Sequence, residues 1–379
     1  MKKRYAIFSL VLAASLTHAA EAQQPAKPNK KPMFTVLPWK NGPGLAEQTI
    51  LQGQTGGTIP LWTYNITSPA DGNSYTGTIV GRNPGFHGHR VTTIKTLIVP
   101  VKLTFQDTGT IFDPTATNAC VGDSVVNLLK NSPIFQNSPY IMNGINVGST
   151  QYGDAFQRAS FWSQVSGTPY HTLLGLTVLP AINVTVPVAN GGTNWAWCGS
   201  YGTMDINWWD AYLQANIFPA LAAQSVGPTT LPIFLFDSVF EYDGDPFNCC
   251  ILGYHSAFGP NNIMQSYSIS SFDTSGTFGG DVSVTSHEIA EWLDDPDTNN
   301  PTPAWGHTGQ VSGCQNNLEV GDPLTGTLVP TVTMNGFDYN LQELAFPSWF
   351  FRQSPSPGTA GVYSNNRTFT VDAGPVCIP

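Results

Sequence analysis

The segment 97–105 has two alternating sets of positions. One set is apolar throughout: Leu97, Val99, Val101, Leu103 and Phe105. The other is mixed: Ile98, Pro100, Lys102 and Thr104. This period of two predicts a β-strand with one apolar face. Pro100 lies inside the segment, and proline cannot donate a hydrogen bond to a sheet ladder. The pattern therefore predicts a strand at a sheet edge or one that contains a bulge.

Other segments show the spacing of amphipathic helices. Two of them begin with an aspartate that can cap free backbone amides, and two end before a proline. The predicted helices cover residues 123–129, 154–165, 205–218 and 282–294. We expect the last one to follow Gly279-Gly280-Asp281 and to end before Pro296.

The remaining pattern is that of strands and turns. We expect a buried strand at 233–242, a more polar strand at 265–270, and irregular strands and loops over 34–86. The tail from residue 326 returns to strand-and-turn composition. Together these segments predict a β-rich α+β fold with a long, irregular N-terminal β segment.

The N-terminus has the pattern of a secretory signal peptide. Lys2, Lys3 and Arg4 precede an apolar run, and Ala20-Glu21-Ala22 provides small residues for cleavage. The apolar run is shorter than the roughly 20 residues that span a bilayer, which argues against a membrane anchor. We predict a signal peptide at 1–22, a flexible leader at 23–33, and a protein that is secreted or periplasmic, without membrane attachment after cleavage.

Charge and composition narrow the classes of partner and fold. After removal of residues 1–22 the chain has 12 basic and 24 acidic side chains, which gives a net charge of −12. An acidic surface repels phosphate backbones, so nucleic acid is a poor candidate partner. The 37 glycines and 30 prolines fit short strands joined by tight turns. We predict one large domain over 34–379, with a sub-boundary near residue 90.

All cysteines lie in the predicted mature part of the chain. Six cysteines in an exported protein indicate disulfides, and six allow fifteen pairings that the sequence does not separate. The residues are Cys120, Cys198, Cys249, Cys250, Cys314 and Cys377. Because Cys249 and Cys250 are adjacent, we expect them to bond to two different partners.

The predicted helix at 282–294 contains the pattern H-E-x-x-E. His287 and Glu291 are four residues apart and share a helix face, so both side chains can reach one ion. Glu288 is one step further round, where it can hold a water next to that ion. The arrangement matches H-E-x-x-H with a glutamate in place of the second histidine. The alternative is a His–Glu pair on the solvated face of a surface helix.

Acidic residues downstream favour the metal site. A catalytic zinc takes three protein ligands, so a third ligand is needed. Our order of preference is Glu319, then Asp322, then His307, with Asp295 as a fourth candidate. For Asp322 the alternative is a turn that hydrogen-bonds its own backbone. His255 is a weaker candidate that could reach the same cleft from the segment after the cysteine pair.

These residues carry a resemblance to a known family. The order helix, buried strand, polar strand, H-E-x-x-E helix and downstream acidic residue over 205–322 resembles the zincin metallopeptidases, and is also similar to a group of secreted bacterial proteins. The resemblance implies a zincin-like mixed sheet whose polar strand is an edge that binds an extended peptide. It also implies His287 and Glu291 as metal ligands, Glu288 as general base, and Glu319 as the third ligand, with Asp322 beside it.

The expected function is therefore a secreted metal-dependent peptidase that acts on peptides or proteins. Zn²⁺ is the expected metal, and the additional oxygen ligands make Ca²⁺ or Mn²⁺ alternatives. Two carboxylates leave a divalent ion with little net charge, which weakens its polarisation of a carbonyl. The competing hypothesis is a non-catalytic secreted protein in which the same carboxylates hold a structural Ca²⁺.

Overall fold

The computed structural model describes residues 33–40, 57–86, 91–259 and 264–378. The predicted signal peptide, the leader up to residue 32 and the predicted sub-boundary near residue 90 lie outside these residues. Among the described residues, no helix combines the length and apolarity that crossing a bilayer requires.

Strands and short helices alternate along the described chain. The strands are β1 Met33–Lys40, β2 Leu61–Thr67, β3 Ser74–Val80, β4 Val91–Phe105, β5 Ile111–Phe112, β6 Ser138–Met142, β7 Ile145–Thr150, β8 His171–Val178, β9 Ile182–Val186, β10 Gly191–Ala196, β11 Gly199–Asp205, β12 Thr230–Asp237, β13 Val239–Tyr242, β14 Cys249–Phe258, β15 Gln265–Phe272, β16 Pro301–Thr308, β17 Val311–Asn317, β18 Val332–Met334 and β19 Phe337–Tyr339. The helices are α2 Val125–Lys130, α3 Tyr152–Ser160, α4 Trp162–Val165, α5 Ile206–Tyr212, α6 Phe218–Ala222, α7 Val282–Asp294 and α8 Pro347–Phe350.

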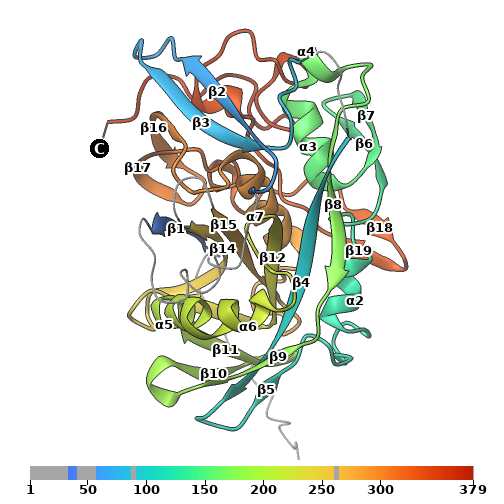
Figure 1. Cartoon of the computed structure of the whole chain (residues 1–379), viewed down its shortest axis with the longest axis vertical. Helices are drawn as coiled ribbons and strands as arrows, with labels where there is room; N and C mark the ends of the chain where they lie inside the picture. The colour runs from blue at the N-terminus through green and yellow to red at the C-terminus, as the bar shows by residue number, and fades with distance from the viewer. Residues whose placement is uncertain (1–32, 41–56, 87–90, 260–263, 379) are drawn as a thin grey trace, which may run out of the picture.

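One large mixed sheet organises the molecule. Its main path runs β10-β11-β13-β14-β15-β12-β4-β5, with β1 added to β14, and β8 and β9 added in turn to the long strand β4 (Figure 1). Both parallel and antiparallel pairs occur, such as β12 with β15 and β14 with β15. The prediction of a β-rich fold of mixed α and β elements is confirmed.

Helices cover the two faces of this sheet. On β12, Ile233 and Leu235 pack into the apolar cluster that contains Ile289 of α7. The alternate residue Phe234 packs into a second cluster with Trp209 of α5. Because side chains of a strand alternate between faces, α7 and α5 lie on opposite sides of the sheet. Both faces of β12 are therefore buried.

The helix that carries H-E-x-x-E begins and ends where the sequence predicts. α7 covers Val282–Asp294, and the Asp281 side chain accepts a hydrogen bond from the Ser283 amide at its start. Nearly all of its residues are buried, including His287 and Glu291. The alternative of a His–Glu pair on a solvated helix face is therefore wrong.

Other helices differ from their predicted limits. Ser124, not Asp123, caps α2. The segment predicted as one helix over 154–165 is divided into α3 and α4, and Asp154 accepts a hydrogen bond from the Thr172 amide instead of capping a helix. The helix that begins at Ile206 continues through a π-helical turn and past Pro219 to residue 222.

Three strand predictions need correction. Pro100 is neither at an edge nor in a bulge, because it pairs in register with Leu235 of β12. On the opposite side of β4, the pairing with β8 ends at Ile98 and the pairing with β9 begins at Val101. Pro100 lies in this gap, where the sheet needs no backbone N–H donor. The predicted strand 233–242 is two strands, separated at Ser238, whose φ is 51°. β15 is not an edge, since it lies between β14 and β12.

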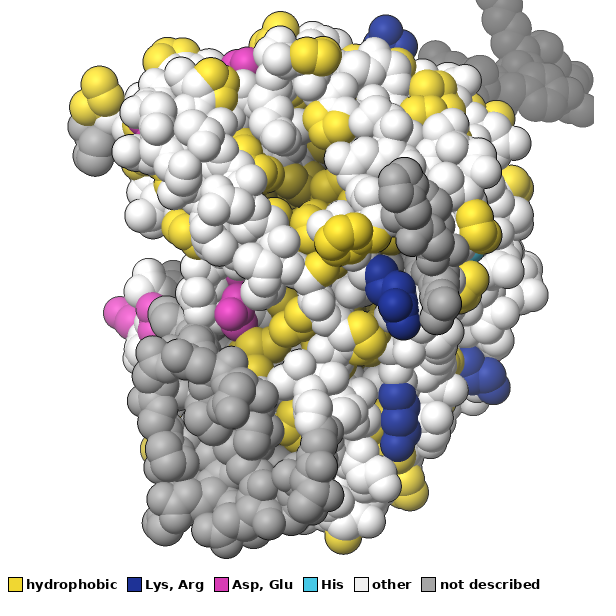
Figure 2. Space-filling view, turned by 45° about the horizontal axis from the view of Figure 1, so that its top comes forward, with side chains coloured by type: hydrophobic (Ala, Val, Ile, Leu, Met, Phe, Trp, Pro, Cys, Tyr) yellow, Lys and Arg dark blue, Asp and Glu magenta, His cyan; other side chains and the backbone are white. Residues whose placement is uncertain are grey.

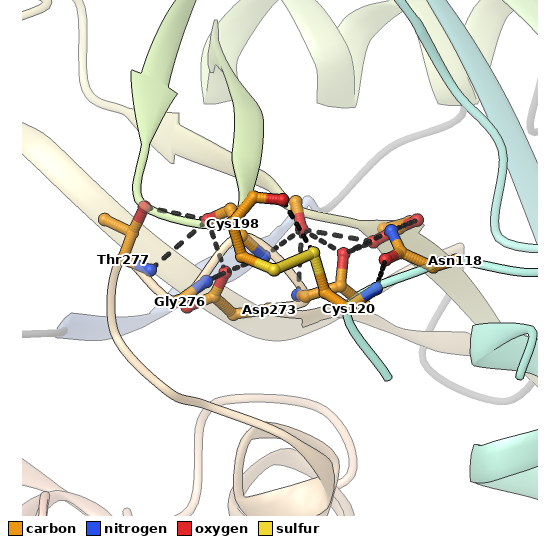
Figure 3. Close-up of a disulfide and its surroundings, with 10 residues drawn as sticks. Asn118, Cys120, Cys198, Asp273, Gly276 and Thr277 are labelled. Carbon is orange, nitrogen blue, oxygen red and sulfur yellow. Dashed lines mark hydrogen bonds between the residues drawn. A yellow bond between two sulfur atoms is a disulfide. The ribbon is translucent and has the colours of Figure 1, made fainter. Parts of the chain in front are cut away.

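The six cysteines form three disulfides. Cys120 bonds to Cys198 and Cys314 to Cys377. Figure 3 shows the first of these beside the turn that contains Asp273. Cys249 and Cys250 bond to each other at the start of β14, so the expectation of two different partners is wrong. The disulfide between these two adjacent cysteines closes a small ring, and the other four cysteines form the two long-range disulfides.

Charged side chains are sparse on the surface. Figure 2 shows a face on which Lys and Arg lie mainly to the right and Asp and Glu mainly to the left, among uncharged residues. Charged residues make up 11% of the chain. The glutamates are a separate case, because all five in the described part are buried: Glu241, Glu288, Glu291, Glu319 and Glu343.

Candidate metal centre

Three segments that are far apart in sequence bring acidic and imidazole side chains together. Helix α7 provides His287, Glu288 and Glu291. Strand β14 provides His255, and the loop after β17 provides Glu319, with Asp322 just beyond it. Ligand atoms of His287, Glu288 and Glu291 lie within 4.8 Å of one another, as do those of His255, Glu291 and Glu319. The structure therefore contains groups that can hold a metal ion.

Hydrogen bonds fix the proton position on His287. Its Nδ1 lies 3.1 Å from Oε1 of Gln342, whose amide nitrogen donates to the carbonyl of Gly321. The Gln342 oxygen must accept, so Nδ1 of His287 carries the proton. Nε2 is then a bare lone pair, 3.0 Å from Oε1 of Glu291 and 3.6 Å from Oδ1 of Asp322. In their carboxylate form both oxygens can only accept, and they face a nitrogen that can only accept.

His255 shows the same arrangement. Its Nε2 lies 3.1 Å from the backbone carbonyl oxygen of Asp295, which can only accept, so Nε2 carries the proton. The lone pair on Nδ1 faces Oε2 of Glu288 at 3.3 Å and Oε2 of Glu291 at 3.7 Å. A proton or a cation is needed between such atoms, because buried lone pairs repel one another.

Glu291 lies between the two histidines. Its Oε1 accepts hydrogen bonds from the amides of Gly321 and Asp322, at 3.1 and 3.2 Å. A Cβ added at Gly321 would lie 2.5 Å from the His287 ring, so only glycine allows this backbone to approach. The close approach aligns the loop after β17 with α7.

The remaining carboxylates have incomplete sets of donors. Glu319 accepts one hydrogen bond from Asn317, at 2.8 Å, and no N–H or hydroxyl group among the described residues donates to its other oxygen. Oε1 of Glu288 likewise has no such donor. Asp322 is better supplied, since Gln310 and Gln315 donate to its two oxygens.

Burial opposes charge on every group of the cluster. It lowers the pKa of His255 to about 3 and that of His287 to about 4, so both rings are neutral near pH 7. Burial, reinforced by neighbouring carboxylates, raises the pKa of Glu288, Glu291 and Glu319 well above the ordinary value. A bound cation would reverse this effect, because it stabilises the carboxylate form.

The structure separates the four candidates for the third ligand. Glu319 and Asp322 lie in the cluster. His307 is exposed on β16, 3.9 Å from the sulfur of Cys314, and is not brought to α7. The carboxylate of Asp295 accepts from the amides of Asn299 and Asn300 and stabilises the turn after the helix. Cys314 offers no thiolate because it is disulfide-bonded.

A residue that sequence reasoning did not identify covers the centre. The ring of Phe34, in β1, stacks on the His287 ring with 3.8 Å between centroids and 16° between planes. The Gln310 side chain binds the Phe34 backbone at both its amide and its carbonyl, each at 2.9 Å. Nothing in the pattern of the irregular N-terminal segment indicates this contact. A cavity of about 330 Å³ beside Phe34 is lined also by Asn317, Glu319 and Asp322.

Comparisons with protein-family models, with curated proteins and with solved structures find no match to this chain. The resemblance to zincins therefore rests on the residues of the chain alone. One of its implications is wrong, because the polar strand β15 is interior to the sheet.

Proposed function

We propose that this protein is a secreted metal-dependent peptidase whose centre lies between α7, β14 and the loop after β17. The observation that carries the proposal is the pair of histidine lone pairs that face buried carboxylates. The donor set fits a divalent transition metal, since imidazole and carboxylate together suit Zn²⁺ and Mn²⁺. Ca²⁺ takes oxygen ligands, so the two imidazoles count against a structural calcium site.

Each residue has a role in the proposed reaction. His287, Glu291 and Asp322 would hold the metal. Glu319 lies next to the carboxylate of Glu291. When bound, the metal polarises the scissile carbonyl as a Lewis acid. Glu288 accepts the proton of the attacking water and returns it to the leaving amine. Its free Oε1 and its position beside His287 on the helix support this role.

The cavity beside the centre supports a peptide substrate. It reaches Glu319 and Asp322 from the surface, and its other lining residues are Gln310 and residues of β1 and β17. The three disulfides support an oxidising compartment, as expected for a secreted enzyme.

Metal content and casein hydrolysis of the mature protein test the proposal, together with the same measurements on Glu288→Gln. We expect bound metal in both proteins and hydrolysis only in the parent. Metal in both with hydrolysis in neither would instead show a structural ion. A protein that binds no metal, and whose melting temperature does not change with a chelator, would refute the proposal.

A further inference from the structure

The two histidines face different oxygens of the Glu291 carboxylate. Nε2 of His287 faces Oε1 of Glu291, and Nδ1 of His255 faces Oε2 of Glu291. Each histidine also has a second carboxylate nearby. For His287 this is Asp322, at 3.6 Å. For His255 it is Glu288, at 3.3 Å, and Glu319 lies in the same group as His255 and Glu291. The centre thus consists of two halves that share Glu291.

We propose that the centre binds two divalent cations bridged by Glu291. One would be held by His287, Glu291 and Asp322, and the other by His255, Glu291 and Glu319. The inference rests on the metal centre of the proposed function and extends it. Ligands about 2.0–2.1 Å from a tetrahedral Zn²⁺ lie about 3.3 Å apart. In the His287 half the separations of 3.0 and 3.6 Å lie on either side of that value, and in the His255 half the separation from Glu291 is 3.7 Å.

Charge supports two cations over one. The cluster has four carboxylates, and the hydrogen bonds of His287 with Gln342 and of His255 with the Asp295 carbonyl account for one ring proton on each histidine. Within the described residues, these carboxylates form ion pairs with histidine and with no Lys or Arg side chain. One divalent cation would compensate only two of the four carboxylates, and a buried carboxylate without a compensating cation is costly. A second cation brings the cluster to neutrality.

Unpartnered atoms are present in both halves. Nε2 of His287 lacks a hydrogen-bond donor in one half, and Oε2 of Glu319 lacks one in the other. Both residues are at least 98% buried, so solvent does not supply the missing donor. In two-metal sites the ions lie about 3.5–4 Å apart and clamp both the attacking and the leaving oxygen. One bridging carboxylate spans such a distance.

The test is the number of metal ions per chain. The mature protein is stripped with a chelator, dialysed against Zn²⁺, and analysed by mass spectrometry of the metal. We expect two ions per chain in the parent and one in His255→Gln. His171→Gln, a partly exposed histidine paired with Asp154 outside the centre, is the control and should retain two. With Mn²⁺, the parent should show the resonance of a coupled pair, and His255→Gln that of an isolated ion.

Each outcome decides between the hypotheses. One ion per chain in the parent would overturn the two-metal inference and leave the proposed function intact. No ion would overturn both. If His255→Gln fails to fold, the parent stoichiometry and its Mn²⁺ resonance still decide, and Glu319→Gln is the second variant.

A separate observation concerns β1. This strand pairs in parallel with β14 from Met33, opposite Ile251, to Lys40, opposite Phe258. Its residue Phe34 is held by Gln310 at both backbone polar groups and lies flat on His287. An extended chain with an aromatic residue thus fits the edge of β14 directly over the centre.

From this we infer that β1 occupies the groove that receives the substrate, and that the substrate is an extended peptide with an aromatic residue over His287. This second inference also rests on the proposed function. It predicts that weakening β1 opens the groove to peptides in solution. Phe34→Ala is the direct variant, and Phe247→Ala, at a side chain that is 87% exposed, is the matched control.

A labelled synthetic peptide with the sequence of residues 31–40 is the probe. We expect it to bind Phe34→Ala roughly tenfold more tightly than the parent or Phe247→Ala, a difference of about 1.4 kcal/mol. The same peptide with alanine in place of its phenylalanine should bind poorly. Fluorescence anisotropy measures binding without any hydrolysis, so a failure of this inference can be distinguished from a failure of the peptidase proposal. Equal affinity for all three proteins would overturn the inference.

Discussion

Two buried acidic regions of this protein have opposite supplies of hydrogen-bond donors. Asp273, beside the Cys120–Cys198 disulfide, accepts hydrogen bonds on Oδ1 from Ser275 and Gly276, at 2.6 to 3.2 Å (Figure 3). Its Oδ2 accepts from the amides of Phe278 and Gly279. At the candidate metal centre, by contrast, Glu288 and Glu319 each keep an oxygen to which no N–H or hydroxyl group among the described residues donates.

The difference shows what distinguishes a structural carboxylate from a ligand. Both regions are buried to a similar degree, so burial alone does not separate them. Glu343 makes the same point, because Ser364, Asn366 and Thr368 donate to it. A buried carboxylate whose two oxygens both receive hydrogen bonds from protein donors needs no cation. One that faces a histidine lone pair does.

The largest expected effect follows from replacing the shared carboxylate. Glu291→Gln removes the negative charge that both halves of the centre use, and its amide nitrogen cannot bind a cation. We expect Zn²⁺ affinity to fall by roughly 100-fold or more, since changes even beyond the ligands cost 10- to 100-fold. Competition with a fluorescent zinc chelator measures this affinity. Asp273→Asn is the control, and an equal loss of affinity in both variants would break the comparison.

The structural carboxylate should show the reverse behaviour. Asp273→Ala leaves buried amides and the Ser275 hydroxyl without an acceptor, and we expect it to lower the free energy of unfolding by on the order of 3 kcal/mol. The loss should be the same with Zn²⁺ and with a chelator. Urea denaturation under both conditions measures it, with the exposed Asp338→Ala as control. A loss that appears only with metal present would assign Asp273 to the centre.

The sequence predicted well those features that depend on neighbouring residues. The limits of α7 follow from its helical period, from the cap at Asp281 and from Pro296. The sequence also predicted that Glu319 and Asp322, downstream of α7, lie near His287 and Glu291. Their role as metal ligands remains a prediction.

Features that depend on distant partners were not predictable in the same way. The interior position of β15 depends on β12 and β14, which are placed by the whole sheet. The pairing of Cys249 with Cys250 leaves the other four cysteines to two bonds between residues 78 and 63 positions apart, which local pattern does not encode. Phe34 reaches His287 only because β1 pairs with β14, a contact that no local period encodes.

The smallest expected effect concerns a carboxylate that lies between the two cases. Asp281 accepts from the amides of Ser283 and Asn340 and from the Asn340 side chain, yet burial raises its pKa to about 6. The unfolded chain has the ordinary pKa near 3.8. Between these values the folded state binds more protons than the unfolded state, so stability falls as pH rises from about 4 to about 6.

Asp281→Asn retains a good helix cap and removes this titration. Relative to the variant, we expect the parent to lose on the order of 1 to 2 kcal/mol of unfolding free energy over that interval. Urea denaturation at intervals from pH 4 to pH 7, with a chelator present throughout, measures the difference while metal is held out. A difference that does not change with pH would mean that the three donors keep Asp281 ionised in the folded state. Asp281 would then belong with Asp273 among the fully supplied carboxylates, and the contrast with the metal centre would become sharper.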